Sequence, residues 1–182
     1  KIYFKDFIND FGNFDEIKQN WITAQDAINL DNKIKIFKTH QGKYNVGKDS
    51  FTNNQNTLAT IYVVRDPRTL VSSISNHFTL TLNEASNFLL TPQIVGNSKR
   101  WEDNKIGMKC LLGKWSDHYR SWTRDISNLL LIKYEDLIQS PENELEKIIE
   151  FLRKYINVET NNDKNKKILE TTSFKNLKEM EQ

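Results

Sequence analysis

Apolar residues follow one another without interruption in two short stretches of the chain. Residues Ile61–Val64 form a β-branched and aromatic run, and residues 128–134 read NLLLIKY. Such runs, bounded by turn residues, are typical of strands that are buried on both faces of a sheet. A third segment, residues 33–37, alternates between polar and apolar side chains. The pattern therefore predicts strands near residues 33–38, 59–65 and 128–134.

Between and beyond these strands, apolar residues recur at helical spacing. The aromatic stripe in residues 1–30, interrupted at Gly12-Asn13, indicates helix that faces a core. Trp115, Tyr119 and Trp122 share one helical face, so we interpret them as packing residues and His118 as structural. We expect helices near residues 68–77, 83–90, 115–122 and 141–152, and loops at residues 45–56 and 93–108. Strands that alternate with helices favour an α/β fold with a parallel sheet.

The central strand ends in the sequence Arg65-Asp66-Pro67, and a helical pattern follows. Proline suits the first turn of a helix, and the aspartate before it suits the N-cap. Arg65 would then lie at the carboxyl end of a parallel strand, beside a helix N-terminus that favours an anion. Ser72 and Ser73 add hydroxyl groups in the early helix, which together predicts a phosphate site. The same turn is also common where its role is only structural.

A second group of reactive side chains, Lys38-Thr39-His40, follows the expected strand at 33–38. Imidazole titrates near neutral pH and can take the proton of an acceptor hydroxyl. A lysine ammonium can stabilise negative charge that develops on a transferred group. The alternative interpretation is that His40 is a polar loop residue without a catalytic role.

Four segments in this order resemble the sulfotransferases that use 3′-phosphoadenosine 5′-phosphosulfate (PAPS). They are KTH at 38–40, YVVRDPRTLVSSISNHF at 62–78, GKWSDHYRSW at 113–122 and YEDL at 134–137, and TTSF at 171–174 is also similar. The resemblance implies that His40 is the general base and that Lys38 contacts the transferred sulfuryl group. It also implies that Arg65 and Ser73 bind the 3′-phosphate, that Tyr134 and Thr172 approach the nucleoside, and that Phe174 stacks on the adenine.

The resemblance further implies a fold and a domain. We expect a P-loop nucleotide-hydrolase-like parallel sheet flanked by helices, in three α/β/α layers, with residues 1–182 forming a single sulfotransferase domain. The family's glycine- and lysine-bearing phosphosulfate loop and its Gly-Asp-Trp region are not found in this sequence. Because both would lie beyond its ends, we expect the sequence to be an internal part of a longer enzyme.

Composition narrows the class of protein. The 182 residues are 37% hydrophobic and 27% charged, which fits one domain with a core, and the net charge of +2 gives no indication of nucleic-acid binding. A single cysteine, Cys110, excludes an intrachain disulfide and fits a reducing compartment. No apolar stretch approaches the roughly 18 residues of a membrane span. The resemblance implies an enzyme with a small-molecule or carbohydrate acceptor. Together with the composition, it leads us to expect a cytoplasmic location, no metal, and no membrane or nucleic-acid partner.

Two other functions remain open from the sequence. One is a P-loop kinase-like transferase, which needs a Gly-x-x-x-x-Gly-Lys-Ser/Thr loop that this sequence lacks. The other is a non-catalytic nucleotide-binding module that has kept the fold.

Overall fold

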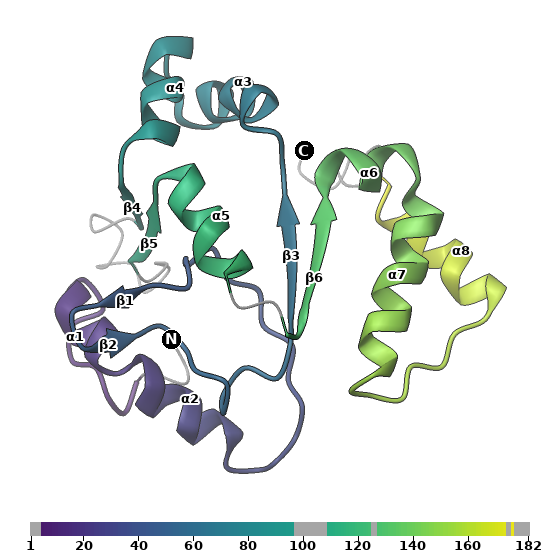
Figure 1. The fold of residues 1–182 in the computed structure, drawn as a ribbon, viewed down its shortest axis with the longest axis horizontal. Coiled ribbons are helices and arrows are strands. Elements are labelled where there is room, and N and C mark those ends of the chain that lie inside the picture. Colours follow the sequence, from purple (N-terminus) through teal and green to yellow (C-terminus); the bar gives the residue numbers. More distant parts are fainter. Residues whose placement is uncertain (1–4, 97–108, 125–126, 174–175, 177–182) are drawn as a thin grey trace. The chain divides into compact units, whose positions relative to one another are not determined.

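The computed structural model describes residues 5–96, 109–124, 127–173 and 176, and Figure 1 shows their helices and strands. The chain separates into two compact units. The first contains residues 1–60 and 67–129, and the second contains residues 61–66 and 130–182.

The first unit begins with two short helices that carry its core. Helix α1 (Phe14–Gln19) starts at Asn13, whose side chain accepts hydrogen bonds from the first-turn N–H groups, and helix α2 (Trp21–Asn29) follows directly. Ile8, Ile17 and Trp21 are buried together, and aromatic residues pack around them. The prediction that the aromatic stripe faces a core is confirmed for residues 5–30, but the helix predicted before Gly12 is wrong, because residues 5–11 form turns and irregular backbone.

A small hairpin follows, in a region where the sequence predicted only a loop. Strand β1 (Asn45–Val46) pairs antiparallel with strand β2 (Asp49–Ser50), with Val46 opposite Asp49. Gly47 lies in the turn with a φ of 66°, a left-handed conformation that glycine adopts without a steric penalty. The prediction of an unbroken loop at residues 45–56 is therefore wrong.

The strand predicted at residues 33–38 is also wrong, because the segment belongs to no sheet. Its apolar side chains are exposed, with Ile36 at 77% and Phe37 at 56%. A strand needs a neighbour to pair its N–H and C=O groups, and alternating side chains do not supply one. The ammonium group of Lys35 instead binds the carbonyl of Ile28 at 2.8 Å, which ties the segment to the end of α2.

Two further helices follow in the first unit. Helix α3 (Pro67–Phe78) begins at the predicted proline, and helix α4 (Leu82–Leu90) packs against it. Thr81 and Glu84 form a reciprocal capping box at the start of α4, which satisfies two N–H groups that have no partner within the helix. The rings of Phe78 and Phe88 stack with their centroids 5.2 Å apart. Both helices confirm the predictions from apolar spacing.

The last part of the first unit is an antiparallel strand pair with a helix. Strand β4 (Gln93–Val95) pairs with strand β5 (Cys110–Gly113), and helix α5 (Trp115–Thr123) packs against β5. The start of the loop predicted at residues 93–108 is thus a strand, because β5 offers it a hydrogen-bonding partner. Residues 97–108 of that loop lie outside the described residues.

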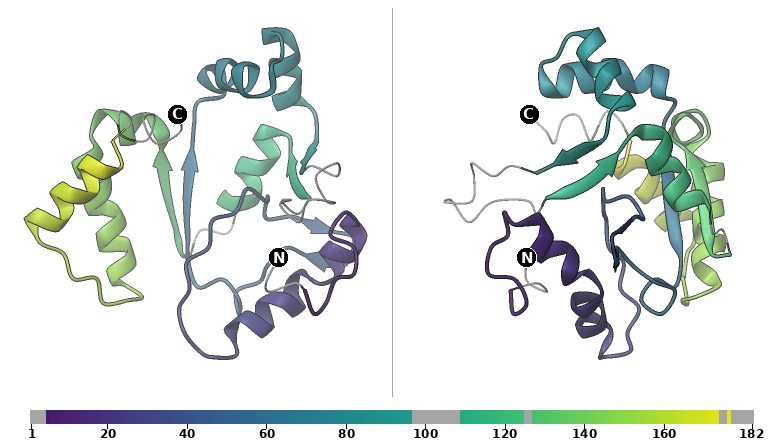
Figure 2. Two further views of the ribbon diagram at one scale, coloured as in Figure 1. Left: turned by 180° about the vertical axis from the view of Figure 1, so that it is seen from behind. Right: turned by 60° about the vertical axis from the view of Figure 1, so that its left-hand side comes forward.

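The second unit is built on two neighbouring strands, β3 (Thr60–Val64) and β6 (Leu129–Lys133), which run in the same direction (Figure 1). Helices α6 (Tyr134–Gln139), α7 (Pro141–Arg153) and α8 (Asn162–Thr171) follow, and α7 packs against both of the others (Figure 2). The strands predicted near residues 59–65 and 128–134 are confirmed, and so is the start of the helix predicted near residues 141–152. The prediction that both strands are buried on both faces is wrong, because the pleat leaves Ile61 and Val63 of β3 and Leu131 of β6 exposed.

The α/β class, with a parallel pair of strands flanked by helices, is therefore confirmed. None of the helices that the structure describes is long and apolar enough to cross a membrane. Within the same residues, no cluster of His, Cys, Asp and Glu side chains could hold a metal ion.

Candidate functional site

Arg65 and Tyr134 meet at the carboxyl ends of the two parallel strands. Arg65 directly follows β3, and Tyr134 directly follows β6. The guanidinium carbon lies 4.8 Å from the centroid of the tyrosine ring, a distance typical of a cation–π contact. Since neighbouring parallel strands end at the same edge of a sheet, the strand pairing itself brings these side chains together.

A second contact connects the residues next to this pair. The backbone N–H of Asp66 donates a hydrogen bond to the Glu135 carboxylate at 3.1 Å. The carboxylate thus joins the turn after β3 to the first residues of α6, which steadies the backbone on both sides of the pair.

The Arg65–Tyr134 pair suits an anionic nucleotide. A guanidinium carries a permanent positive charge and donates paired hydrogen bonds that match the oxygens of a phosphate. A ring stacked under it fixes the guanidinium plane, so fewer conformations are lost when an anion binds. The residues present therefore fit the phosphate group that the sequence predicts at this strand edge.

Thr172 and Phe174 were the other nucleoside-binding candidates in this unit. Thr172 caps the end of α8, and its hydroxyl donates to the carbonyl of Ile168 at 2.7 Å. Its side chain is exposed, and the hydroxyl oxygen keeps lone pairs that can accept a hydrogen bond. Phe174 lies outside the described residues.

The remaining candidates belong to the first unit. Ser73 is half-buried on α3, one residue before the buried Ile74. Lys38 and His40 are exposed on the irregular segment that follows α2. The structure therefore joins Arg65 with Tyr134 in one unit and carries Lys38, His40 and Ser73 in the other.

Helix α5 holds the main chain around His40. The Nε2 atom of His118 lies 3.1 Å from the carbonyl oxygen of His40, and the indole N–H of Trp122 donates to the next carbonyl, that of Gln41, also at 3.1 Å. The hydroxyl of Ser121 accepts the N–H of Lys43 at 3.0 Å. Three side chains from two adjacent turns of one helix thus bind the main chain at residues 40, 41 and 43.

Strand β5 holds the same segment from its own edge. The N–H of Gly42 donates to the carbonyl of Leu111 at 3.0 Å, and the Leu111 N–H donates to the side-chain oxygen of Gln41 at 2.7 Å. The hydroxyl of Tyr44 donates to the carbonyl of Leu112 at 2.8 Å. Although residues 33–44 form no strand, their last part is therefore firmly attached to α5 and β5.

Burial changes the proton affinity of three groups near this attachment. It lowers the pKa of His118, and it raises the pKa of the Cys110 thiol to about 11. Burial, with a smaller contribution from the charge of Asp117, raises the pKa of Tyr44 to about 12. At neutral pH all three groups are therefore uncharged, and they act as packing and hydrogen-bonding groups.

Sequence reasoning identified His118 as structural and Trp122 as a packing residue, but it missed their hydrogen bonds to His40 and Gln41. It placed the helix correctly, and the prediction of packing is confirmed for Trp115 and Tyr119, whose rings stack with centroids 5.8 Å apart. His118 is bonded to a residue 78 positions away, and a separation of that size leaves no local pattern. The available signal was that Trp and His each carry an N–H group that needs an acceptor when buried.

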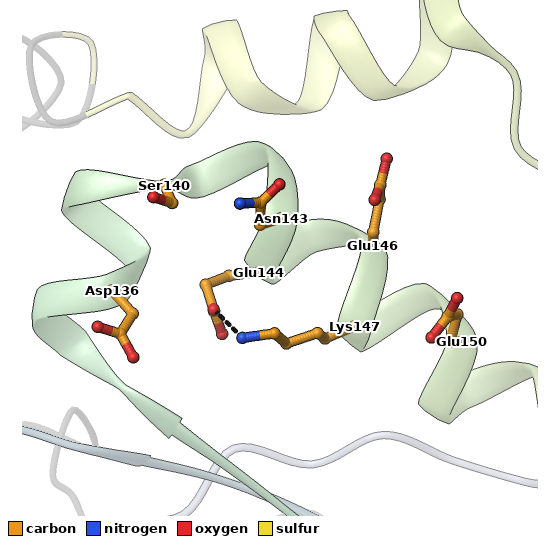
Figure 3. Close-up of a pocket in the computed structure, with 7 residues that line it drawn as sticks. All are labelled: Asp136, Ser140, Asn143, Glu144, Glu146, Lys147 and Glu150. Carbon is orange, nitrogen blue, oxygen red and sulfur yellow. Dashed lines mark hydrogen bonds and ion pairs between the residues drawn. The ribbon is translucent and has the colours of Figure 1, made fainter.

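A cavity of about 420 Å³ lies in the second unit between α6 and α7 (Figure 3). Its lining includes four carboxylates, on Asp136, Glu144, Glu146 and Glu150, and one ammonium group, on Lys147. The Lys147 ammonium is paired with the buried Glu144 carboxylate. Because the remaining charge is negative, this cavity would repel an anionic nucleotide, and we do not assign the cofactor to it.

Comparison with known proteins gives a consistent set of relatives. Residues 8–182 match the family model for the sulfotransferase domain. The chain is 27% identical over 149 residues to a 3-alpha-hydroxysteroid sulfotransferase of Cavia porcellus, covering 81% of this chain and 47% of the relative. It is 27% identical over 168 residues to sulfotransferase 2A1 of Homo sapiens, covering 87% of this chain and 52% of the relative.

One solved structure, mouse sulfotransferase SULT7A1 complexed with PAP, matches with a TM-score of 0.49 and 25% identity, over 66% of this chain and 40% of that one. The chain spans about half the length of the curated relatives it matches. The family model covers all but the first seven residues, and on that ground the chain belongs to the sulfotransferase domain family.

Proposed function

We propose that the protein transfers a sulfuryl group from PAPS to a hydroxyl or amine of a small acceptor molecule. Family membership supports the reaction class. The observation that carries the proposal is the Arg65–Tyr134 pair at the carboxyl ends of β3 and β6, where an open α/β sheet binds its ligands. We further propose that both units belong to one sulfotransferase domain, since the family match spans them.

On the nucleotide side, we assign Arg65 and Ser73 to the 3′-phosphate. The guanidinium supplies charge and paired donors, and the hydroxyl adds a neutral donor. Tyr134, Thr172 and Phe174 are assigned to the nucleoside, where rings can stack and a hydroxyl oxygen can accept a hydrogen bond. When bound, PAPS supplies the activated sulfuryl group and leaves as 3′-phosphoadenosine 5′-phosphate (PAP).

On the acceptor side, we assign His40 as the general base. A neutral imidazole takes the proton that the acceptor hydroxyl loses as its oxygen bonds to sulfur. The Lys38 ammonium, two residues earlier, stabilises negative charge on the sulfuryl oxygens and on the departing bridging oxygen. Both side chains are exposed on a segment whose main chain is bonded to α5 and β5, so they are accessible to an acceptor.

The relatives narrow the class of acceptor. One of them is named for 3-alpha-hydroxysteroids, which are small molecules that carry a hydroxyl group. We therefore propose a hydroxylated small molecule as the acceptor and retain carbohydrates as a class to be tested.

Calorimetric titration of the full-length protein with PAP and, separately, with ATP tests the cofactor class. We expect PAP to bind and ATP to bind at least tenfold more weakly. Transfer assays with PAPS and a panel of hydroxysteroids, phenols and sugars then test the reaction, with His40→Ala as the inactive variant. A preference for ATP would replace the proposal with a kinase-like function, and PAP binding without any transfer would indicate a binding module.

A further inference from the structure

The candidate base His40 lies on a segment that no sheet ladder stabilises. Residues 31–44 contain no strand, and the side chain of His40 is exposed. A general base must nevertheless stay within hydrogen-bond reach of the proton that it takes, and small displacements of a catalytic group are costly. Something outside a sheet must therefore restrict the backbone at His40.

Besides the bonds that β5 makes to Gln41 and Gly42, the N–H donors of two aromatic side chains on α5 restrict it. His118 bonds the carbonyl of His40 itself, and Trp122 bonds the carbonyl of Gln41. His118 is half-buried, and Trp122 is buried, with only 8% of its surface exposed. A polar N–H group in such a position makes a bond to a carbonyl costly to lose, because little water is available to replace it.

We propose that His118 and Trp122 are positioning residues for the reaction, and that they act by fixing the peptide groups on the carboxyl side of His40. This inference rests on the proposed role of His40 as the base. Neither residue is assigned to the nucleotide or to the acceptor. Both act through the backbone, which leaves the imidazole of His40 available for the acceptor.

The chemistry of His118 suits this role. A carbonyl oxygen can only accept, so the Nε2 atom of His118 must carry the proton in this contact. Burial keeps His118 neutral at neutral pH, and a neutral ring adds no positive charge beside His40. A cation in that place would oppose the protonation of His40 and weaken it as a base.

The alternative is that α5 only stabilises the fold. The two roles differ in what they predict for catalysis. A purely structural contact would lower the melting temperature and the amount of active protein without changing turnover per folded molecule. A positioning contact lowers kcat in protein that is folded and still binds nucleotide.

The test uses paired variants of the full-length protein. His118→Leu removes the donor at similar volume, and His118→Gln keeps an N–H donor. Trp122→Phe keeps a buried ring but lacks the N–H group. It therefore removes the second hydrogen bond, the one to the Gln41 carbonyl, independently of His118. Trp115→Phe is the matched control, because Trp115 lies on the same helix and stacks on Tyr119.

We expect His118→Leu and Trp122→Phe to lower kcat roughly 10- to 100-fold. The Kd for PAP should stay within twofold of the wild-type value. His118→Gln should recover most of the lost kcat, and Trp115→Phe should leave it unchanged. In a His40→Ala background, His118→Leu should have no further effect on the residual rate, because positioning has no value once the base is absent.

The outcomes separate this inference from the proposed function. If the wild-type protein transfers no sulfuryl group, or if His40→Ala keeps full activity, the proposed function fails first. If His40→Ala is inactive while His118→Leu and Trp122→Phe turn over at the wild-type rate, the proposed function stands and the positioning role is overturned. Additive losses in the His40→Ala background would overturn it as well. Should His118→Leu fail to fold, Trp122→Phe decides by the same measurements.

Discussion

The guanidinium of Arg65 lies over the ring of Tyr134, with 4.8 Å between the guanidinium carbon and the ring centroid. The two residues are 69 positions apart in the chain, and each is the first residue after a strand of the same parallel pair. Strand pairing alone therefore places a fixed cation and an aromatic face at one edge. The first prediction follows from this pair.

Replacing Arg65 should weaken nucleotide binding. A charge-assisted contact to phosphate contributes roughly 1.5–3 kcal/mol, so Arg65→Ala should raise the Kd for PAP about 10- to 150-fold. Arg65→Lys should lose less, since the charge remains while the planar, stacked guanidinium does not. Titration calorimetry measures both.

Arg120→Ala is the control for this experiment, because that guanidinium is exposed and pairs with Asp117 at 3.5 Å. Its effect on the Kd should stay within twofold. Equal effects of Arg65→Ala and Arg120→Ala would remove Arg65 from the phosphate site.

Gly113 should tolerate alanine poorly. Its φ is 66°, and a Cβ there would collide with the hydroxyl of Tyr44. Gly47 has the same φ with open space around it, so Gly47→Ala isolates the backbone strain of about 1–2 kcal/mol. Gly113→Ala should cost about 1–3 kcal/mol more than Gly47→Ala in thermal or urea unfolding.

Adding Tyr44→Phe to Gly113→Ala should recover part of that difference, because it removes the atom that the new Cβ would strike. Equal unfolding free energies for Gly47→Ala and Gly113→Ala would show that Tyr44 does not restrict the position.

His118 should make stability depend on pH in the mildly acidic range. Burial lowers its pKa in the folded protein below the value of about 6.5 expected in the unfolded chain. Between those two values the unfolded chain binds more protons, so acidification favours unfolding. The contribution of His118 is therefore complete above pH 6.5 and is lost as the pH falls through the lowered folded-state pKa.

Urea unfolding of wild type and His118→Gln between pH 5 and pH 7.5 measures this dependence. Carboxylates elsewhere titrate in both proteins and cancel in the difference. The stability advantage of wild type over His118→Gln should shrink on acidification. Parallel curves over the whole range would contradict a lowered pKa for His118.

Cys110 should react slowly with thiol reagents in the native protein. Burial raises its pKa to about 11, so little thiolate is present at pH 8. We expect modification by Ellman's reagent to be at least about tenfold slower than in urea-unfolded protein, after allowing for the greater nucleophilicity of a high-pKa thiolate. Because the sequence has one cysteine, the measured rate of modification belongs to Cys110 alone. Equal rates in native and unfolded protein would contradict the burial of this thiol.

Sequence reasoning worked best where a single local pattern was sufficient. The runs at 61–64 and 128–134 and the helix after Pro67 are described by their own composition, and β3, β6 and α3 formed as expected. It failed where structure depends on a distant partner. Residues 33–38 alternate like a strand but belong to none of the sheets in the described part of the chain, whereas β4 pairs with β5.

The same distinction applies to the candidate site. Arg65 and Tyr134 were identified from strand ends and from family resemblance, and the structure brings them together. The bonds from α5 to residues 40–43 were not predicted, because a histidine and a tryptophan on a helix face resemble ordinary packing residues in sequence. Hydrogen bonds across nearly 80 positions become visible only in three dimensions.

The hydrogen bonds that α5 makes to residues 40, 41 and 43 go to backbone carbonyl and amide groups, which these positions possess regardless of their side chains. The helix therefore does not specify which side chains the segment carries. Substitution of His40 or Lys38 would therefore leave the backbone hydrogen bonds from α5 in place. Among proteins with this fold, we accordingly expect the reactive side chains to vary within residues 38–43, while the residues of α5 that bind this backbone stay the same.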